Sequence, residues 1–344
     1  MSIKLGPVLR FHGINNDAWR ISILLTTQNE TNPPQLTSSM ASGEALGVDV
    51  VAIKNKVLAG SNWTVWRYDL EVPQTNNPQS INYSIQNFGG YSFTVPASES
   101  LPNCAYVSCN GFSDPKLMKK VSDHFERWRD LNSNHDKTPY HLLIMGGDQV
   151  YSDSMWQELP SLNAWSEKSN RFKLSFTAKM QQEVDDFFFK LYLKRWSQVD
   201  MSQAFSSIPT LMMWDDHDIF DGWGSYPKDQ HESDVYQNIF RIAREYFSIF
   251  QLHGAQPPDG YFPGQTAFNA GYSAGKLGVL ALDMRSERTL NQVISPASWN
   301  SVYGWLDSIP PGQFDHLFVM SSIPVVHADF DALESMLGIF PGQQ

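Results

Sequence analysis

The chain has 344 residues, of which 42% are hydrophobic and 13% aromatic, so it can bury a sizeable core and is long enough for roughly two domains. Its formal net charge of −11 argues against a nucleic-acid backbone or an anionic membrane surface as an electrostatic partner. No apolar run reaches the roughly 18 residues that a transmembrane helix needs. Residues 1–19 lack the apolar segment of a signal peptide, so a cytoplasmic location is expected.

Short segments of alternating hydrophobicity fill residues 1–98. Asn, Pro, Gly and Ser interrupt them, most clearly in QNETNPPQ and PQTNNPQ. Regular short strands separated by turn residues are typical of an antiparallel β-sandwich. We therefore predict an all-β sandwich domain over residues 1–98, with a linker in the segment VPASESLPN, residues 95–103.

From residue 104 onward, predicted strands alternate with predicted helices. The strands are CAYVSC, YHLLIMGGD and PTLMMWDDHD, followed later by AFNAGYSAG, LGVLALDMR and HLFVMSSIPVV. Helices are predicted over residues 113–131, with Asp114 as N-cap and Pro115 as the first helical residue, and over residues 177–199 and 234–252. Such alternation indicates an α/β fold whose largely parallel sheet is covered by helices.

The two cysteines, Cys104 and Cys109, belong to the same predicted strand. Because side chains alternate along a strand, a spacing of five places them on opposite faces, too far apart for a disulfide. The absence of a disulfide framework is typical of an intracellular protein.

Side chains that can bind metals follow three of the predicted strands. Cys109 ends the first, the segment GGDQVYSD with Asp148, Tyr151 and Asp153 follows the second, and DDHD follows the third. Each has an ordinary alternative, since a cysteine is often a core residue, GGD a turn, a tyrosine a buried aromatic, and an aspartate a helix cap. Carboxyl ends of adjacent parallel strands lie at one edge of a sheet, so the coincidence favours a site for one or two metal ions.

The segments GGDQVYSD and WDDHDIFDGWGS resemble the motifs of PhoD-like alkaline phosphatases, a branch of the calcineurin-like metallophosphoesterases. The resemblance covers residues 104–344. It implies a four-layer α/β/β/α sandwich with a dinuclear metal site between the sheets, preceded by the N-terminal β domain.

This resemblance also implies the metal ligands. Asp148 would bridge two ions and Asp216 would bind one of them. Cys109 and Tyr151 stand where the family places the ligands of a ferric ion. Oxygen ligands on the other side would suit Ca²⁺, with other divalent metals as alternatives.

Further roles follow for residues beside these ligands. The resemblance implies that His217 protonates the leaving group or holds the phosphate. Arg285, in ALDMRSER, would clamp the phosphate, with a structural salt bridge as the alternative. Asp215 and Asp218 would orient His217, support the loop or lie behind the ligands.

The family's late Gly-Asp-x-His motif has no counterpart in the sequence, so we expect the domain to be C-terminally incomplete. His327 either replaces a ligand of that motif or is a loop histidine. The predicted function is metal-dependent hydrolysis of a phosphate monoester or diester, with a small molecule or a phospholipid as substrate. The alternative is an inactive fragment or a non-catalytic scaffold that keeps the fold.

Overall fold

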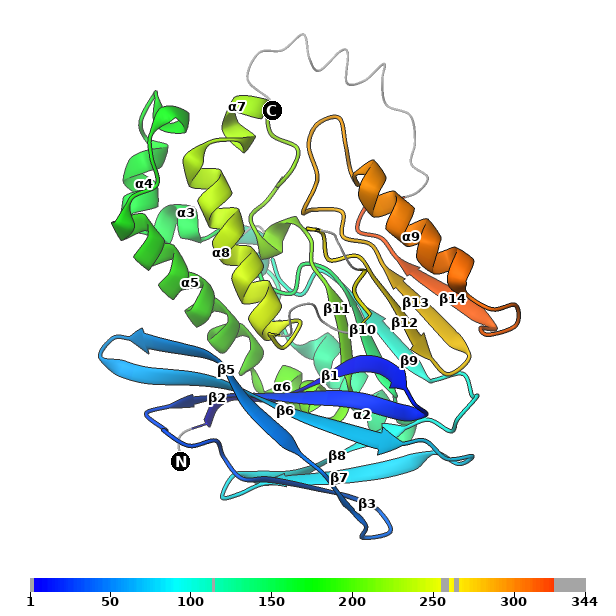
Figure 1. Cartoon of the computed structure of the whole chain (residues 1–344). Coiled ribbons are helices and arrows are strands. Elements are labelled where there is room, and N and C mark those ends of the chain that lie inside the picture. The colour runs from blue at the N-terminus through cyan, green and yellow to red at the C-terminus, as the bar shows by residue number, and fades with distance from the viewer. Residues whose placement is uncertain (1–2, 113–114, 255–259, 263–265, 325–344) are drawn as a thin grey trace.

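The computed structural model describes residues 3–112, 115–254, 260–262 and 266–324. Within these residues the chain forms three β-sheets, with most of the helices on one side of the largest sheet (Figure 1). No helix among the described residues combines the length and the apolar character needed to cross a membrane.

The largest sheet has seven strands and includes both N-terminal and later segments. Its strands, in spatial order, are β5 (Asp49–Leu58), β6 (Ser61–Pro73), β2 (Ala18–Gln28), β1 (Ile3–Asn15), β11 (Thr210–Met213), β10 (Leu142–Gly146) and β9 (Cys104–Val107). The pairs among β5, β6, β2 and β1 are antiparallel. The pairs β1–β11, β11–β10 and β10–β9 are parallel, which confirms the parallel arrangement predicted for the first three of the later strands.

A second, antiparallel sheet lies beneath the N-terminal strands. It contains β4 (Ala45–Leu46), β3 (Leu36–Met40), β7 (Gln79–Ile85) and β8 (Gly89–Val95). All strands before residue 98 therefore pair antiparallel with one another, as the alternating pattern predicts. However, Arg10 of β1 pairs with Thr210 of β11, so the large sheet continues into the later part of the chain. The domain boundary near residue 98 stays a prediction.

The third sheet consists of β12 (Ala270–Ala274), β13 (Leu277–Ala281) and β14 (His316–Met320). The β13–β14 pair is parallel, but β12 and β13 pair antiparallel, so the prediction of one largely parallel sheet was wrong for these strands. One of its faces joins the buried cluster that includes Leu142 and Leu211 of the large sheet. On its other face lies α9 (Pro296–Ser308), whose Val302 packs in a cluster with Leu280 and Leu282 (Figure 1).

The remaining helices cover the opposite face of the large sheet. They are α1 (Pro115–Met118), α2 (Glu126–Lys137), α3 (Met155–Glu158), α4 (Pro160–Ser166), α5 (Ala178–Trp196), α6 (Val199–Ser207), α7 (Lys228–His231) and α8 (Asp234–Phe250). Leu143 and Met145 of β10 point into their cluster, whereas Leu142 and Ile144 point into the cluster between the sheets. Because side chains alternate along a strand, the two clusters lie on opposite faces. Parallel aromatic stacking joins α5 to α8, with Tyr192 and Phe250 ring centroids 4.6 Å apart.

The structure confirms one long predicted helix and divides another. The helix predicted over residues 177–199 is confirmed as α5, which ends at Trp196 because the extended backbone at Gln198 separates it from α6. Ser202 donates a hydrogen bond to the carbonyl of Trp196 at this break. The helix predicted over residues 113–131 is instead divided into α1 and α2, with a non-helical segment between Met118 and Glu126. Asp114, its predicted N-cap, lies outside the described residues.

A buried chain of polar side chains joins β1 and β2 to the segment after α8. Arg10 donates from Nε to the carbonyl of Gln251 at 3.1 Å and contacts His12 Nδ1 through Nη1 at 2.9 Å. The Ser22 hydroxyl lies 2.6 Å from His12 Nε2 and 2.7 Å from His253 Nδ1. Burial, followed by the charge of Arg10, lowers the pKa of both histidines well below the ordinary value, so both are neutral at pH 7.

Candidate metal centre

The ends of β9, β10 and β11 bring the predicted ligands to one edge of the large sheet. These strands are parallel neighbours, so Cys109, Asp148 and Asp216 all follow carboxyl ends at the same edge. A sharp turn directs Asp148 into the site, with φ of 102° at Gly147 and 55° at Asp148. A Cβ on Gly147 would lie 2.7 Å from that of Asp215, so only glycine fits there.

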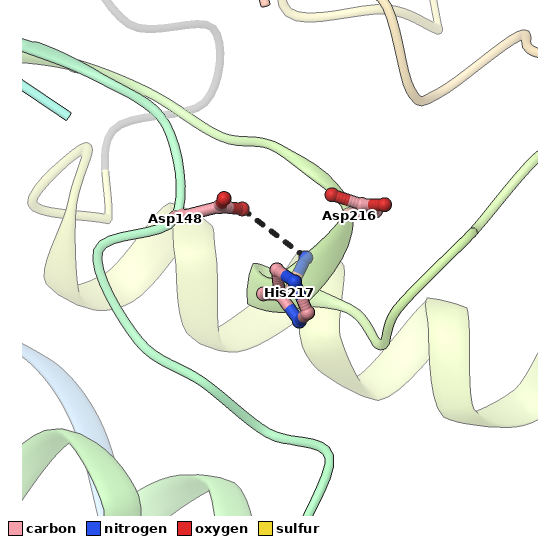
Figure 2. Close-up of side chains that lie close together, drawn as sticks. All are labelled: Asp148, Asp216 and His217. Carbon is pink, nitrogen blue, oxygen red and sulfur yellow. Dashed lines mark hydrogen bonds between the residues drawn. The ribbon is translucent and has the colours of Figure 1, made fainter. Parts of the chain in front are cut away.

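Asp148, Asp216 and His217 form the first group of possible ligands. One ligand atom from each of the three lies within 4.8 Å of those of the other two (Figure 2). Asp216 and His217 belong to a short 3₁₀ turn, η2 (Asp216–Asp218), directly after β11. The backbone N–H of His217 donates to Asp148 Oδ1 at 3.2 Å, which fixes the turn against the end of β10 (Figure 2). The structure therefore places the two carboxylates close together, as the strand-end argument predicts.

Cys109 and Tyr151 lie on the other side of Asp148. The thiol of Cys109 donates to Asp148 Oδ2 at 3.5 Å and also hydrogen bonds to the Tyr151 side chain. The Tyr151 ring stacks on His217, with ring centroids 4.4 Å apart. Asp148, which is only 5% exposed, thus contacts a thiol group on one side and the turn of Asp216 and His217 on the other.

His217 is oriented by Asp153, a residue to which the sequence analysis assigns no individual role. The imidazole Nδ1 lies 2.6 Å from Asp153 Oδ2, while Nε2 lies 4.0 Å from Asp221 Oδ1. Burial alone would lower the pKa of His217, but the hydrogen bond and charge of Asp153, helped by Asp148 and Asp216, raise it to about 9. Both residues are present in the predicted motifs, yet only the fold shows that they pair.

Asp218 supports the loop and does not contact the His217 ring. Its Oδ1 accepts hydrogen bonds from the backbone of Gln149 and Val150 at 3.0 and 3.1 Å and from the Gln251 side chain at 3.0 Å. Its Oδ2 accepts from the backbone of Asp215 at 2.9 Å. Burial and then the charge of Asp148 raise the pKa of Asp218 to about 8. Of the roles predicted for this residue, the structure therefore shows support of the loop.

Arg285 forms the structural salt bridge that the sequence analysis gives as the alternative to a phosphate clamp. Its Nε pairs with Asp215, and its Nη2 lies 3.3 Å from Asp216 Oδ1. Its Nη1 donates to the carbonyl of Trp223 at 3.0 Å, and the whole residue is 7% exposed. Asp215 thus pairs with Arg285 instead of orienting His217.

Asp283 supports this arrangement from the end of β13. Its Oδ1 accepts hydrogen bonds from the Trp214 indole at 2.8 Å and from the Arg285 backbone at 2.9 Å. It lies in the ALDMRSER segment. Its position directly after an apolar run is the sequence feature that could have identified it as a residue of the site. His327, the remaining candidate from the sequence, lies outside the described residues.

The charges and donor types around Asp148 fit a metal cation. Burial and then the charges of Asp215 and Asp216 raise the pKa of Asp148 to about 6, so its ionised form lacks sufficient positive charge nearby. Burial and then Asp148 also raise the pKa values of Cys109 and Tyr151, which keeps both neutral in the absence of a cation. Carboxylate, imidazole, thiolate and phenolate together are ligands typical of transition metals.

Comparison with known proteins places the chain in a family. A family model described as PhoD related phosphatase matches residues 90–342. The chain belongs to this family. The match confirms the resemblance to PhoD-like phosphatases.

Two individual proteins illustrate the similarity. An uncharacterized protein of Saccharomyces cerevisiae is 26% identical over 380 residues, which span 94% of this chain and 54% of the yeast protein. The chain thus spans about half the length of that relative. The solved structure of PhoD aligns with a TM-score of 0.47 and 13% identity, covering 81% of this chain and 51% of PhoD.

Proposed function

We propose that the chain hydrolyses phosphate esters with the help of two metal ions. The observation that carries this proposal is the central position of Asp148. It belongs to one group with Cys109 and Tyr151 and to another with Asp216 and His217. A carboxylate shared by two groups of ligands is suited to bridge two ions, which need be only about 3.5–4 Å apart.

The two groups differ in the metal that they would hold. Cys109 and Tyr151 would supply a thiolate and a phenolate, which suit Fe³⁺, while Asp216 would supply oxygen ligands for Ca²⁺ or another divalent ion. When bound, the ions would neutralise the carboxylates and polarise the phosphate ester.

The surrounding residues would bind, orient and transfer a proton. His217, held through Nδ1 by Asp153, would donate the Nε2 proton to the leaving-group oxygen. Arg285 would act as a positioning residue for Asp216, through the 3.3 Å contact between them. A direct hold on the phosphate by Arg285 would require that contact to be exchanged for one with the substrate.

We also propose that the layers of the structure form the family's four-layer α/β/β/α sandwich. The order of α5 and α8, the large sheet, the three-stranded sheet and α9 supports this assignment (Figure 1). Residues 1–98 would then be an additional β domain whose first strand extends the catalytic sheet.

The test is to measure bound metals by mass spectrometry and turnover of aryl phosphate monoesters, diesters and phospholipids. The matched variants are Asp148→Asn and Asp130→Asn, the latter on the exposed surface of α2. We expect Asp148→Asn to lose both metals and turnover, while Asp130→Asn keeps both. Turnover that survives Asp148→Asn would refute the site. Metal binding without turnover of any ester would refute the enzyme and favour the non-catalytic scaffold.

A further inference from the structure

Two adjoining cavities lie beside the metal centre, between α2 and the end of α5. Their volumes are about 340 and 360 Å³, within the range of small-molecule sites. Phe112, His124 and Arg195 line both of them, so they form two halves of one recess.

This recess shares two walls with the metal centre. Cys109 lines the first cavity and donates through its thiol to Asp148. Tyr151 lines the second and stacks on His217. A molecule in the recess would therefore lie against Cys109 and Tyr151, and the rest of a phosphate ester bound at the proposed metal centre would extend into it.

The lining of the recess is positively charged, although the chain carries a net charge of −11. Arg127, Lys194 and Arg195 contribute to it, and the described residues that line the two cavities include no aspartate or glutamate. The cationic side chains of this recess would thus attract an anion, whereas most of the acidic protein surface would not.

Arg195 is the cation best placed to bind such an anion. Its Nε donates to the carbonyl of Asn110 at 3.1 Å, and Nη2 contacts the same oxygen. Burial lowers the pKa of Arg195 below its ordinary value. Within the described part of the chain, neither Arg195 nor Arg127 forms an ion pair with a carboxylate. A partly buried guanidinium without a counter-charge gains from a bound anion, which also forms charge-assisted hydrogen bonds with it.

Aromatic rings complete the lining. Phe112 and His124 contact each other with ring centroids 5.2 Å apart, between the two halves of the recess. Trp128 lines the first cavity and Phe125 the second. These rings provide apolar surface next to the cationic groups, which suits a ligand with an apolar body and a charged end.

We propose that the recess binds the leaving group of the substrate, and that this group is an apolar or aromatic body bearing a second anionic substituent. The proposal rests on the proposed phosphoesterase activity and adds the substrate class to it. Arg127 and Arg195 are the residues that distinguish such a substrate from a neutral analogue.

The experiment compares two substrates of the same shape, 4-carboxyphenyl phosphate and the neutral 4-carbamoylphenyl phosphate. The measured quantity is the ratio of their kcat/KM values in the metal-loaded full chain. Arg127→Ala is the main variant, because Arg127 is exposed and pairs with no described carboxylate. Lys137→Ala is the control, since it removes one positive charge from the same helix outside the recess.

We expect Arg127→Ala to lower the ratio of carboxylate to carboxamide substrate about threefold to fivefold, as for an exposed charge pair. Arg195→Gln should lower the ratio at least about tenfold, because the ion pair between Arg195 and the substrate carboxylate is less exposed to water. Lys137→Ala should leave the ratio unchanged, and Arg127→Lys should restore most of it. An unchanged ratio in Arg127→Ala, or an equal fall in Lys137→Ala, would overturn the proposal.

A binding measurement separates this inference from the proposed activity. Calorimetric titration of both aryl phosphates in the presence of a chelator reports on the recess without requiring turnover. If the wild-type chain binds the carboxylate more tightly and Arg127→Ala does not, the inference holds even where no ester is hydrolysed. Equal affinity of the wild-type chain for the two compounds would refute the inference while leaving the metal site untouched.

Discussion

Replacing Asp148 with asparagine should stabilise the metal-free protein while it removes metal binding. Burial and the charges of Asp215 and Asp216 raise the pKa of Asp148 from 3.8 to about 6. A shift of about 2 units corresponds to about 3 kcal/mol of unfavourable free energy for the ionised form. Asparagine removes the charge but keeps an acceptor oxygen for the His217 N–H. We therefore expect the free energy of unfolding to rise by about 1–3 kcal/mol at pH 7.5.

The pH dependence of this gain provides a stricter test. Because the pKa of Asp148 is higher in the folded than in the unfolded chain, folding favours the protonated form. The stabilising contribution of Asp148 is present below pH 4 and is lost as pH rises through about 6. The difference between variant and wild type should thus be small near pH 4 and reach its maximum above pH 7.

Urea unfolding followed by tryptophan fluorescence, with a chelator present, measures the difference. Asp130→Asn is the control and should show no such pH-dependent gain. Added metal should reverse the order, because binding stabilises only the wild type, by about 4.1 kcal/mol at a thousand times the Kd. If the metal-free Asp148→Asn protein were less stable than wild type at pH 7.5, the reasoning about an undercompensated negative charge would be wrong.

Three further predictions test other parts of the structure. Arg285→Met should lower the free energy of unfolding by about 3–5 kcal/mol, since it leaves Asp215, whose side chain is only 14% exposed, without its partner; a loss below about 1 kcal/mol in urea unfolding would contradict this. The pKa values of His12 and His253 are lowered in the folded state, so their stabilising effect is present above pH 6.5 and lost as pH falls, by up to about 1.4 kcal/mol per pH unit for each. His253→Gln should roughly halve that slope between pH 5 and 6.5, and equal slopes would count against the buried neutral pair. Phe188→Ala, at a fully buried position between α5 and α8, should cost about 3–5 kcal/mol, whereas Phe88→Ala, at a position that is 46% exposed, should cost less than about 0.5 kcal/mol in thermal unfolding.

Local patterns were sufficient to predict the strands that carry the candidate site. The apolar runs of β10 and β11 end abruptly in Gly-Gly-Asp and Asp-Asp-His, and both strands have close to the predicted bounds. Their parallel pairing then makes the proximity of Asp148 and Asp216 a consequence of sheet geometry. Such information lies within ten residues of sequence, so no tertiary contact is needed to find it.

Partners distant in sequence could not be predicted in this way. The pairing of Asp153 with His217 depends on how two loops lie relative to each other. The salt bridge between Asp215 and Arg285 depends on the position of the third sheet. The pairing of β1 with β11 likewise has no local signal, because alternation indicates a strand but not its neighbour. α9 was missed although local signals for it were present, with Ser295 as N-cap, Pro296 as the first helical residue, and Trp299, Val302 and Leu306 at helical spacing.

The position of β1 between β2 and β11 also has a consequence for synthesis on the ribosome. Thr210 hydrogen bonds to the carbonyl of Leu9, a residue 201 positions earlier in the chain. At about 5–20 residues per second, the ribosome needs roughly 10–40 s to make the intervening segment. Over that interval β2, β5 and β6 can join β1 on one side, while its other edge has no strand to pair with. An exposed edge of this kind can pair with another nascent chain, so the yield of folded protein should depend on translation speed and on chaperones that shield the first strand.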